Sequence, residues 1–313
     1  MLKPPRHVLV LAGPTASGKT PVSLLLASRL NGQIISADSR QIYKFMDIGT
    51  AKPSIDDRKK IKHYFVDELM PDEDFNAGEF GKKGRLVIDK IFHARKTPLI
   101  VGGSGLYIQA LIDGFFEGPP ADPSLRKHLH DRLKIEGPDI LLQELKGIDP
   151  AAASRMLPSN VRRIIRALEI YELTGVPISR LQQERTPFHF IPCIAGLEWD
   201  RRVLYERINL RTDWMMKQGL KQEVERLQEL GYRRDLNALQ TVGYKEMFDY
   251  LHHDIGYDRM VELIKQNSRR YAKRQLTWFR RDQRIRWFKV DDEGDFPDVA
   301  EKIVQYFLEK NIA

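Results

Sequence analysis

The sequence predicts an α/β protein, with a parallel sheet flanked by helices and interrupted by an all-helical insertion. Short β-branched runs alternate with amphipathic stretches over roughly the first 110 residues, which is typical of a parallel sheet covered on both faces. From Ser124 to about Gln183 the pattern is helical only. Glycines and prolines cluster at Gly114–Pro123 between the two regions and indicate a linker or hinge.

We therefore expect a core of residues 1–118 and 190–313 and a helical insertion domain of residues 119–189. The expected strands are Val8–Ala12, Gln33–Ala37, His63–Val66, Pro98–Gly102, Phe188–Leu197 and Arg286–Val290. The expected helices of the insertion are Leu125–Ile135, Asp139–Lys146, Ala151–Met156 and Val161–Leu173. Those that follow it are Val203–Leu230, Lys245–Leu251, Tyr257–Arg281 and Asp298–Lys310.

The first expected strand leads into Gly13-Pro14-Thr15-Ala16-Ser17-Gly18-Lys19-Thr20, and an apolar helix follows. These residues fit the phosphate-binding pattern G-x-x-x-x-G-K-[ST] in the strand–loop–helix context that it requires. The backbone N–H groups and the helix N-terminus would hold phosphate oxygens. Lys19 would reach the outer phosphates, and the Thr20 hydroxyl would bind Mg²⁺. The sequence thus predicts a P-loop NTPase-like sheet that binds a diphosphate or triphosphate.

Further polar residues follow the other strands, whose carboxyl ends should meet near this loop. Asp38 is positioned as a general base or metal-side ligand, with an N-cap of a helix at Ser39–Phe45 as the compatible alternative. Ser104 lies in the glycine-rich segment Val101–Tyr107, where the backbone can approach a ligand. Lys52, in the loop Asp47–Pro53, could touch phosphate, although a surface turn is the favoured interpretation.

The charge distribution favours a polyanionic partner. The chain carries a net charge of +8, and the segment Arg259–Arg286 holds ten Lys or Arg residues and two acids. Such a stripe suits nucleic acid, although a solvated helix face is the alternative. Arg162, Arg163 and Arg166 lie together on an expected helix, where they too could be merely exposed.

Other segments leave more than one interpretation open. Arg207 and Arg211 are four residues apart, and either could bind phosphate oxygens. Tyr244 within Gln240–Lys245 could stack on a base or simply pack. Aromatic residues are interleaved with bases over Arg269–Arg281, a pattern that suits an RNA backbone, but Trp278 and Phe279 could form the buried side of that helix.

Composition excludes several classes of protein. No apolar run approaches the roughly 18 residues that a membrane span needs, and no signal or transit peptide precedes the first strand. The single cysteine, Cys193, excludes an internal disulfide and a cysteine-based zinc site. We therefore expect a cytoplasmic protein without a membrane partner.

Taken together, the ordered segments resemble the tRNA dimethylallyltransferase (tRNA isopentenyltransferase) family in its compact bacterial form. The matching segments are Gly13–Thr20, Ser36–Tyr43, Met46–Pro53, Val101–Tyr107, Arg162–Glu169, Thr241–Lys245 and Ala272–Phe279. The resemblance implies transfer of a dimethylallyl group from dimethylallyl diphosphate to N6 of adenine 37, next to the tRNA anticodon. It implies Mg²⁺ as cofactor and release of diphosphate, and we expect a monomer.

The resemblance also assigns roles. Asp38 would be the general base and Arg211 would steady the leaving diphosphate. Ser104 stands where the family usually has threonine, and because the hydroxyl is kept we expect it to keep the catalytic role. Residues Gly13–Thr20 would hold the donor, with Thr20 on the metal. The implied tRNA contacts are Asp38, Ser39, Arg40, Gln41, Ser104, Arg126, Arg162, Arg163, Arg166, Gln240, Thr241, Val242, Gly243, Tyr244 and Lys245.

Two other hypotheses compete with this one. A small-molecule or nucleotide kinase would explain the loop and the sheet but not the basic C-terminal helix. A non-catalytic RNA-binding module predicts, as the enzyme does, that Asp38→Ala retains tRNA binding, and only the enzyme predicts that turnover collapses.

Overall fold

The computed structural model describes residues 6–114, 118–119, 122–183 and 190–312. The chain divides into two compact units. The first, called the core unit here, comprises Met1–Ile112 and Phe188–Ala313, and the second, the insertion unit, comprises Asp113–Pro187. Each is described by itself.

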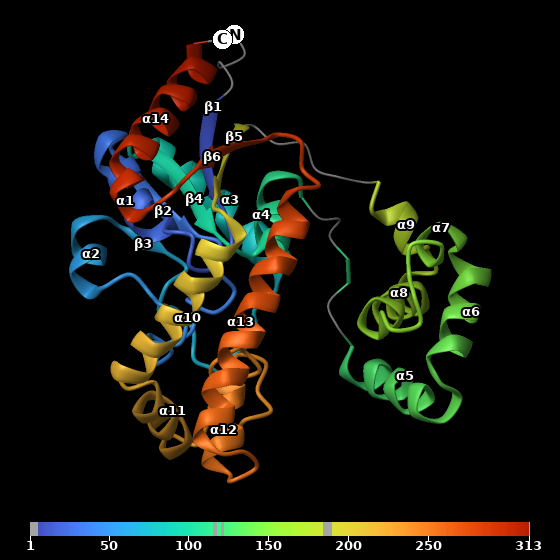
Figure 1. Ribbon diagram of the computed structural model, residues 1–313. Coiled ribbons are helices and arrows are strands. Elements are labelled where there is room, and N and C mark those ends of the chain that lie inside the picture. The colour runs from blue at the N-terminus through green and yellow to red at the C-terminus, as the bar shows by residue number, and fades with distance from the viewer. Residues whose placement is uncertain (1–5, 115–117, 120–121, 184–189, 313) are drawn as a thin grey trace. The chain divides into compact units, whose positions relative to one another are not determined.

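The core unit is built on one sheet of six parallel strands in the order β3-β2-β4-β1-β5-β6 (Figure 1). This result confirms the predicted parallel sheet. The strands are β1 (Arg6–Ala12), β2 (Gly32–Ser36), β3 (His63–Tyr64), β4 (Thr97–Gly102), β5 (Phe190–Glu198) and β6 (Ile285–Lys289).

The position of β1 explains its continuous apolar sequence. It lies between β4 and β5, with Leu9 opposite both Leu99 and Cys193. Residues Val8–Ala12 are at most 1% exposed, as expected for a parallel strand that is buried on both faces. Because β2 pairs with β4 and β4 with β1, the loops that follow these three strands lie at one edge of the sheet.

Helices of the core unit pack on the sheet and on one another. Helix α1 packs against α14, α3 against α4, and α13 against both α10 and α12. These helices are α1 (Lys19–Arg29), α2 (Ile55–Lys60), α3 (Ala77–His93), α4 (Gly105–Ile112), α10 (Arg201–Lys217), α11 (Leu220–Glu229), α12 (Tyr244–Leu251), α13 (Tyr257–Phe279) and α14 (Phe296–Ile312). A short 3₁₀ helix, η1 (Glu293–Asp295), precedes α14.

Two expectations about helices in the core unit are wrong. The single helix expected at Val203–Leu230 is broken into α10 and α11 at Gly219, whose φ of +97° suits glycine. Residues Ser39–Phe45 form turns rather than a helix, so Asp38 does not cap a helix there. Instead, Asp38 Oδ1 accepts a hydrogen bond from Arg40 N at 2.9 Å and closes a local turn.

The insertion unit consists of short helices around an apolar core of its own. Leu129, Leu141, Leu145 and Leu168 are fully buried in this core. The helices are α5 (Pro123–Glu136), α6 (Pro138–Ile148), α7 (Pro150–Ala153), α8 (Val161–Thr174) and α9 (Ile178–Leu181). The helical nature expected for this segment is thereby confirmed.

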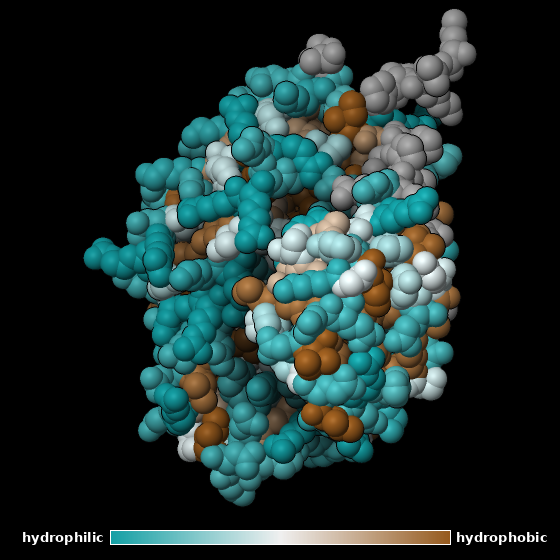
Figure 2. Space-filling model, turned by 90° about the vertical axis from the view of Figure 1, so that its right-hand side faces the viewer, coloured by the Kyte–Doolittle hydropathy of each residue, from teal (hydrophilic) through white to brown (hydrophobic). Residues whose placement is uncertain are grey.

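The surface in Figure 2 is mainly hydrophilic, with separate hydrophobic patches. Ile135 and Leu157 are among the exposed apolar side chains of the insertion unit. Among the described helices, none combines the length and the apolar character that a membrane crossing requires.

Candidate active site

The phosphate loop is held from outside by side chains of α10 and of the β5–α10 connection. Arg207 Nε donates to the Ala16 carbonyl at 3.0 Å, and Trp199 Nε1 donates to the Ser17 carbonyl at 3.0 Å. Because the C=O and N–H groups of a peptide point in opposite directions, the N–H groups that follow these two carbonyls are turned away from the external donors. An anion-binding loop needs N–H groups that face its interior.

Close packing explains the glycines of the loop. A Cβ at Gly18 would lie 2.3 Å from the Phe296 ring, and the φ of this glycine is +83°. A Cβ at Gly13 would lie 2.8 Å from Ser17 Oγ. That hydroxyl is fully buried and has no hydrogen-bond partner among the residues that the structure describes.

Burial gives the cations of the site unusual electrostatics. Lys19 Nζ donates to the Pro14 carbonyl at 2.6 Å. Desolvation lowers the pKa of Lys19 to about 8, although Asp38 nearby opposes this shift and Arg211 adds to it. Burial also lowers the pKa of Arg211, again against the attraction of Asp38. Two partly desolvated cations therefore gain from an anion placed between them.

We predict that affinity for inorganic diphosphate falls as the pH rises through about 8. Below this pH Lys19 is charged and binds the anion, whereas above it the amine must first take up a proton. The affinity should then fall by up to about tenfold per pH unit. Calorimetric titration from pH 7 upward measures the effect. Lys19→Arg is the control, because arginine stays charged, and parallel curves for the two proteins would contradict the prediction.

Several of the predicted catalytic and tRNA-binding residues line one pocket of about 280 Å³ in the core unit. It joins the phosphate loop to the segment after β2, to the inner parts of α10 and α13, and to the segment before α12. The lining residues that the sequence predicted are Thr15, Asp38, Ser39, Arg40, Arg211, Gln240, Thr241, Val242 and Gly243. Thr212, Met215, Ser268, Tyr271 and Arg274 are among those that it did not.

Ser104 organises the turn that carries Asp38. Its Oγ accepts a hydrogen bond from Ser39 N at 3.1 Å, and its own N–H donates to the Ala37 carbonyl at 3.1 Å. A hydrogen bond with Ser104 also engages Tyr271, whose pKa rises to about 12, mainly through burial and also through the charge of Asp38. The serine hydroxyl therefore holds Asp38 in place, with the Tyr271 phenol kept neutral beside it.

The two arginines of α10 have different surroundings. Arg207 lies over the Trp199 ring at 4.2 Å from its centroid and pairs with Glu293 at 2.8 Å, so it supports the loop from behind. Arg211 NH1 donates to Thr15 Oγ1 at 2.8 Å and lines the pocket. Of these two arginines, Arg211 lines the pocket and Arg207 is not among its lining residues, a distinction that spacing alone leaves open.

Glu223 of α11 holds one wall of the pocket in place through hydrogen bonds. Its carboxylate accepts hydrogen bonds from Asp47 N and Ile48 N at 2.8 Å each and from Gly49 N at 3.1 Å. It also accepts one from the Tyr244 hydroxyl at 2.6 Å. Tyr244 is 0% exposed, so its interpretation as a base-stacking side chain does not fit this structure.

We predict that Glu223→Ala destabilises the protein by about 3 kcal/mol, because three N–H groups and one hydroxyl lose a charged acceptor. Urea unfolding at neutral pH measures the change. Glu225→Ala on the same helix is the matched control, since Glu225 forms only a half-exposed pair with Lys221 and should cost less than about 1 kcal/mol. Equal losses for the two variants would show that Glu223 is an ordinary surface acid.

Lys52 is not available to a phosphate. Its side chain is 2% exposed, pairs with Asp47 at 2.7 Å and forms a second ion pair with Asp67. Asp67 in turn pairs with Arg58. The interpretation of Lys52 as a possible phosphate contact is therefore wrong. This lysine instead stabilises the loop that contains it.

Several predicted tRNA-binding side chains already have partners within their own unit. In the insertion unit, Arg126 and Arg166 both pair with the buried Glu169, at 2.9 and 2.7 Å. Arg162 and Arg163 are exposed. In the core unit, Gln41 hydrogen-bonds Ser36, Thr50 and Ala51, Gln240 Nε2 donates to the Arg234 carbonyl, and Lys245 is exposed.

The donor set around the loop suits a magnesium ion that arrives with phosphate oxygens. Mg²⁺ prefers oxygen ligands and is commonly bound by one or two protein groups together with substrate phosphates. Thr20 and Asp38 offer such oxygens beside the phosphate loop. Within the described residues there is no cluster of three His, Cys, Asp or Glu side chains for a metal.

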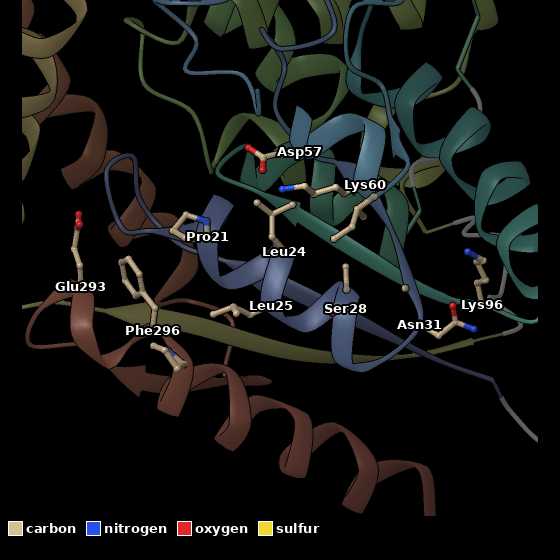
Figure 3. A pocket seen from close by; sticks show the side chains of 14 residues that line it. Pro21, Leu24, Leu25, Ser28, Asn31, Asp57, Lys60, Lys96, Glu293 and Phe296 are labelled. Carbon is tan, nitrogen blue, oxygen red and sulfur yellow. The ribbon is translucent and has the colours of Figure 1, made fainter. Parts of the chain in front are cut away.

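Further cavities lie outside this pocket, and two of them differ clearly in the residues that line them. One, of about 740 Å³, follows the outer side of α1, where the side chains of Leu24, Leu25 and Phe296 lie below charged groups such as Asp57 and Lys60 (Figure 3). It contains none of the predicted site residues. The other, of about 390 Å³, is lined by Arg270, Lys273, Arg274, Thr277, Trp278 and Arg281 of α13 and its C-terminal end. Arg274 lines both this basic groove and the central pocket.

The fold and the site define a phosphate-loop α/β protein with a carboxylate-bearing pocket beside the loop. The profile of the IPP transferase family matches residues 41–282. The chain belongs to this family. This result confirms the resemblance found in the sequence and the assignment to prenyltransferase enzymes. The matched range includes Ser104 and Arg211 but begins after Asp38 and the phosphate loop.

Curated relatives match along nearly their whole length. The tRNA dimethylallyltransferase of Pelotomaculum thermopropionicum is 46% identical over 302 residues, which cover 95% of each chain. That of Acetivibrio thermocellus is 45% identical and covers 96% of this chain and 97% of the relative.

Solved structures agree. The tRNA isopentenylpyrophosphate transferase of Bacillus halodurans is 39% identical, with a TM-score of 0.71 over 98% of both chains. A eukaryotic dimethylallyltransferase described as acting on tRNA is 27% identical, with a TM-score of 0.81. The match covers 97% of this chain and 80% of the eukaryotic one.

Proposed function

We propose that this chain transfers the dimethylallyl group of dimethylallyl diphosphate to N6 of adenine 37 in tRNA, and releases diphosphate. The observation that carries the proposal is the pocket that Thr15 of the phosphate loop, Asp38 and Arg211 line together. A diphosphate in the loop would place its allylic carbon on the Asp38 side, where the acceptor amine must arrive.

On the donor side, the chain supplies positive charge where the leaving group gains negative charge. Lys19, Arg211 and the N–H groups of the loop would stabilise diphosphate as the allylic C–O bond breaks. The Ser17 hydroxyl, which is buried and without a partner in the described part of the chain, would offer one further donor to an oxygen inside the loop. Mg²⁺ held by Thr20 and the diphosphate oxygens would neutralise more of that charge.

On the acceptor side, Asp38 would take a proton from the exocyclic amine as the new C–N bond forms. The base must leave the stacked anticodon loop to enter the pocket, and the wall formed by Gln240–Gly243 would receive it. Ser104 holds the Asp38 turn through Ser39 N, so the carboxylate keeps its position during the reaction.

The direct test incubates the protein with an unmodified tRNA transcript, dimethylallyl diphosphate and Mg²⁺, followed by mass spectrometry of the nucleosides. We expect dimethylallyladenosine at position 37 and release of diphosphate. A transcript with guanine at that position is the control. If ATP instead gives transfer of its terminal phosphate to a small molecule while no prenylated nucleoside forms, the kinase alternative holds.

We further propose that tRNA follows the basic groove of α13 into the pocket, because Arg274 lines both. Arg270, Lys273 and Arg281 are exposed, and Trp278 offers a half-buried ring beside them. Cations interleaved with an aromatic residue suit a single-stranded RNA segment.

We predict that Lys273→Ala with Arg281→Ala weakens tRNA binding and reduces the slope of log affinity against log salt by about 1 for each lost phosphate contact. Filter binding over a range of salt concentrations measures the slope. Arg233→Ala is the matched control, because Arg233 is exposed but paired with Asp235 at 2.9 Å. An unchanged slope in the double variant would assign these residues to a solvated helix face.

A further inference from the structure

Gln275 of α13 is a buried polar side chain that the mechanism above does not use. It is 7% exposed, on the face of the helix where Ala272 and Phe279 are also buried. Burying an amide costs free energy unless its hydrogen bonds are satisfied. A glutamine among these apolar neighbours therefore needs hydrogen-bond partners.

Both ends of this amide are bound, each to a different glycine-rich loop. Gln275 Oε1 accepts a hydrogen bond from Thr15 N at 2.8 Å, and Nε2 donates to the Gly103 carbonyl at 2.9 Å. Only one orientation of the amide satisfies both groups, since the reverse would oppose donor to donor and acceptor to acceptor. A Cβ at Gly103 would lie 2.3 Å from Nε2, so the approach also depends on that glycine.

The bridge acts on the part of the phosphate loop that faces the pocket. Thr15 lines the pocket, and its hydroxyl accepts from Arg211 NH1 at 2.8 Å. Gln275 itself is not among the lining residues. Its influence on a bound anion therefore passes through Thr15, the residue that Arg211 also contacts.

We propose that Gln275 is a positioning residue for the donor diphosphate, because its amide sets the Thr15 peptide and locks the phosphate loop to the loop after β4. The proposal rests on the proposed function for the identity of the donor. The geometry requires only that the loop binds a diphosphate.

The test compares two variants of Gln275 whose side chains can form different hydrogen bonds. Gln275→Met keeps the size and removes both hydrogen bonds. Gln275→Glu keeps an acceptor for Thr15 N. While it is ionised, however, its second oxygen places a negative charge against the Gly103 carbonyl oxygen. Burial raises the pKa of a carboxyl group, and a protonated glutamic acid would again donate to that carbonyl while accepting from Thr15.

With inorganic diphosphate and Mg²⁺ as the probe, we expect Gln275→Met to bind about tenfold more weakly than the original protein at every pH. Gln275→Glu should bind weakly at high pH and recover toward the original affinity as the pH falls. Affinity for a tRNA transcript should stay unchanged in both. In the enzyme assay the KM for donor should rise more than kcat falls.

Gln266→Met is the matched control, since Gln266 is half-buried on the same helix and should bind diphosphate normally. Wild-type affinity in Gln275→Met, equal losses for diphosphate and tRNA, or no acid recovery in Gln275→Glu would each overturn the proposal. If Gln275→Met does not fold, the pH response of Gln275→Glu alone decides. Because diphosphate binding is read directly, a failure of prenyl transfer is distinguishable from a failure of this bridge.

Discussion

Asp38→Asn is expected to lower kcat for prenyl transfer by about 10²–10⁴-fold while tRNA binding is retained. The amide keeps the size of the side chain and can still accept the hydrogen bond from Arg40 N, so the turn should persist. What it loses is the ability to take a proton from the acceptor amine. Single-turnover assays with saturating tRNA and donor measure the effect, since they separate chemistry from binding.

The control for this variant is Asp72→Asn, at an exposed carboxylate outside the pocket, for which unchanged turnover is expected. If Asp38→Asn kept more than about a tenth of the original kcat, Asp38 would not be the base. A parallel loss of tRNA affinity would instead make Asp38 a binding group.

Arg211→Met should lower kcat by about 10²–10³-fold, the range typical of losing one group that stabilises developing negative charge. The same variant should be at least as stable as the original protein in thermal unfolding. Burial lowers the pKa of Arg211, which means that holding this charge without an anion is unfavourable in the folded protein. A loss of activity without a loss of stability is the signature of a functional charge.

Arg207→Met is the contrasting variant. Arg207 binds the Ala16 carbonyl, the Trp199 ring and Glu293, so its loss should lower the melting temperature and raise the donor KM. Both effects follow from a loosened loop. If the two variants behaved alike, the distinction between a charge that meets the ligand and a charge that supports the loop would be wrong.

Much of the fold could be predicted because the signals are local. The apolar run of β1 and the glycines after it specify a buried strand and a tight turn, whatever else surrounds them. The break between α10 and α11 could not be predicted in this way. Gly219 lies within a continuous amphipathic pattern, and one glycine inside such a pattern is often tolerated.

The candidate site was predictable where a motif lies beside a strand, as for Lys19, Asp38 and Ser104. Tyr271 and Gln275 were missed because they lie in the middle of a basic helix and act across long sequence separations. A polar residue at a buried helical position, four residues after a tyrosine, was the available signal. Tyr244 shows the opposite error, because a functional role was considered for a residue that packs in the interior. An aromatic residue in a polar segment is equally suited to packing, and the structure buries it.

The contacts that support the phosphate loop from behind determine when its anion site can be completed during synthesis. The loop lies near the start of the chain, yet its carbonyls are bound by Trp199 and Arg207, and β1 gains its second neighbour only with β5. During synthesis, which runs from the N-terminus, the first half of the chain emerges with a complete motif but no finished anion site. A nascent or truncated chain that ends before β5 therefore carries the motif without these supports, and we expect it to hold no donor.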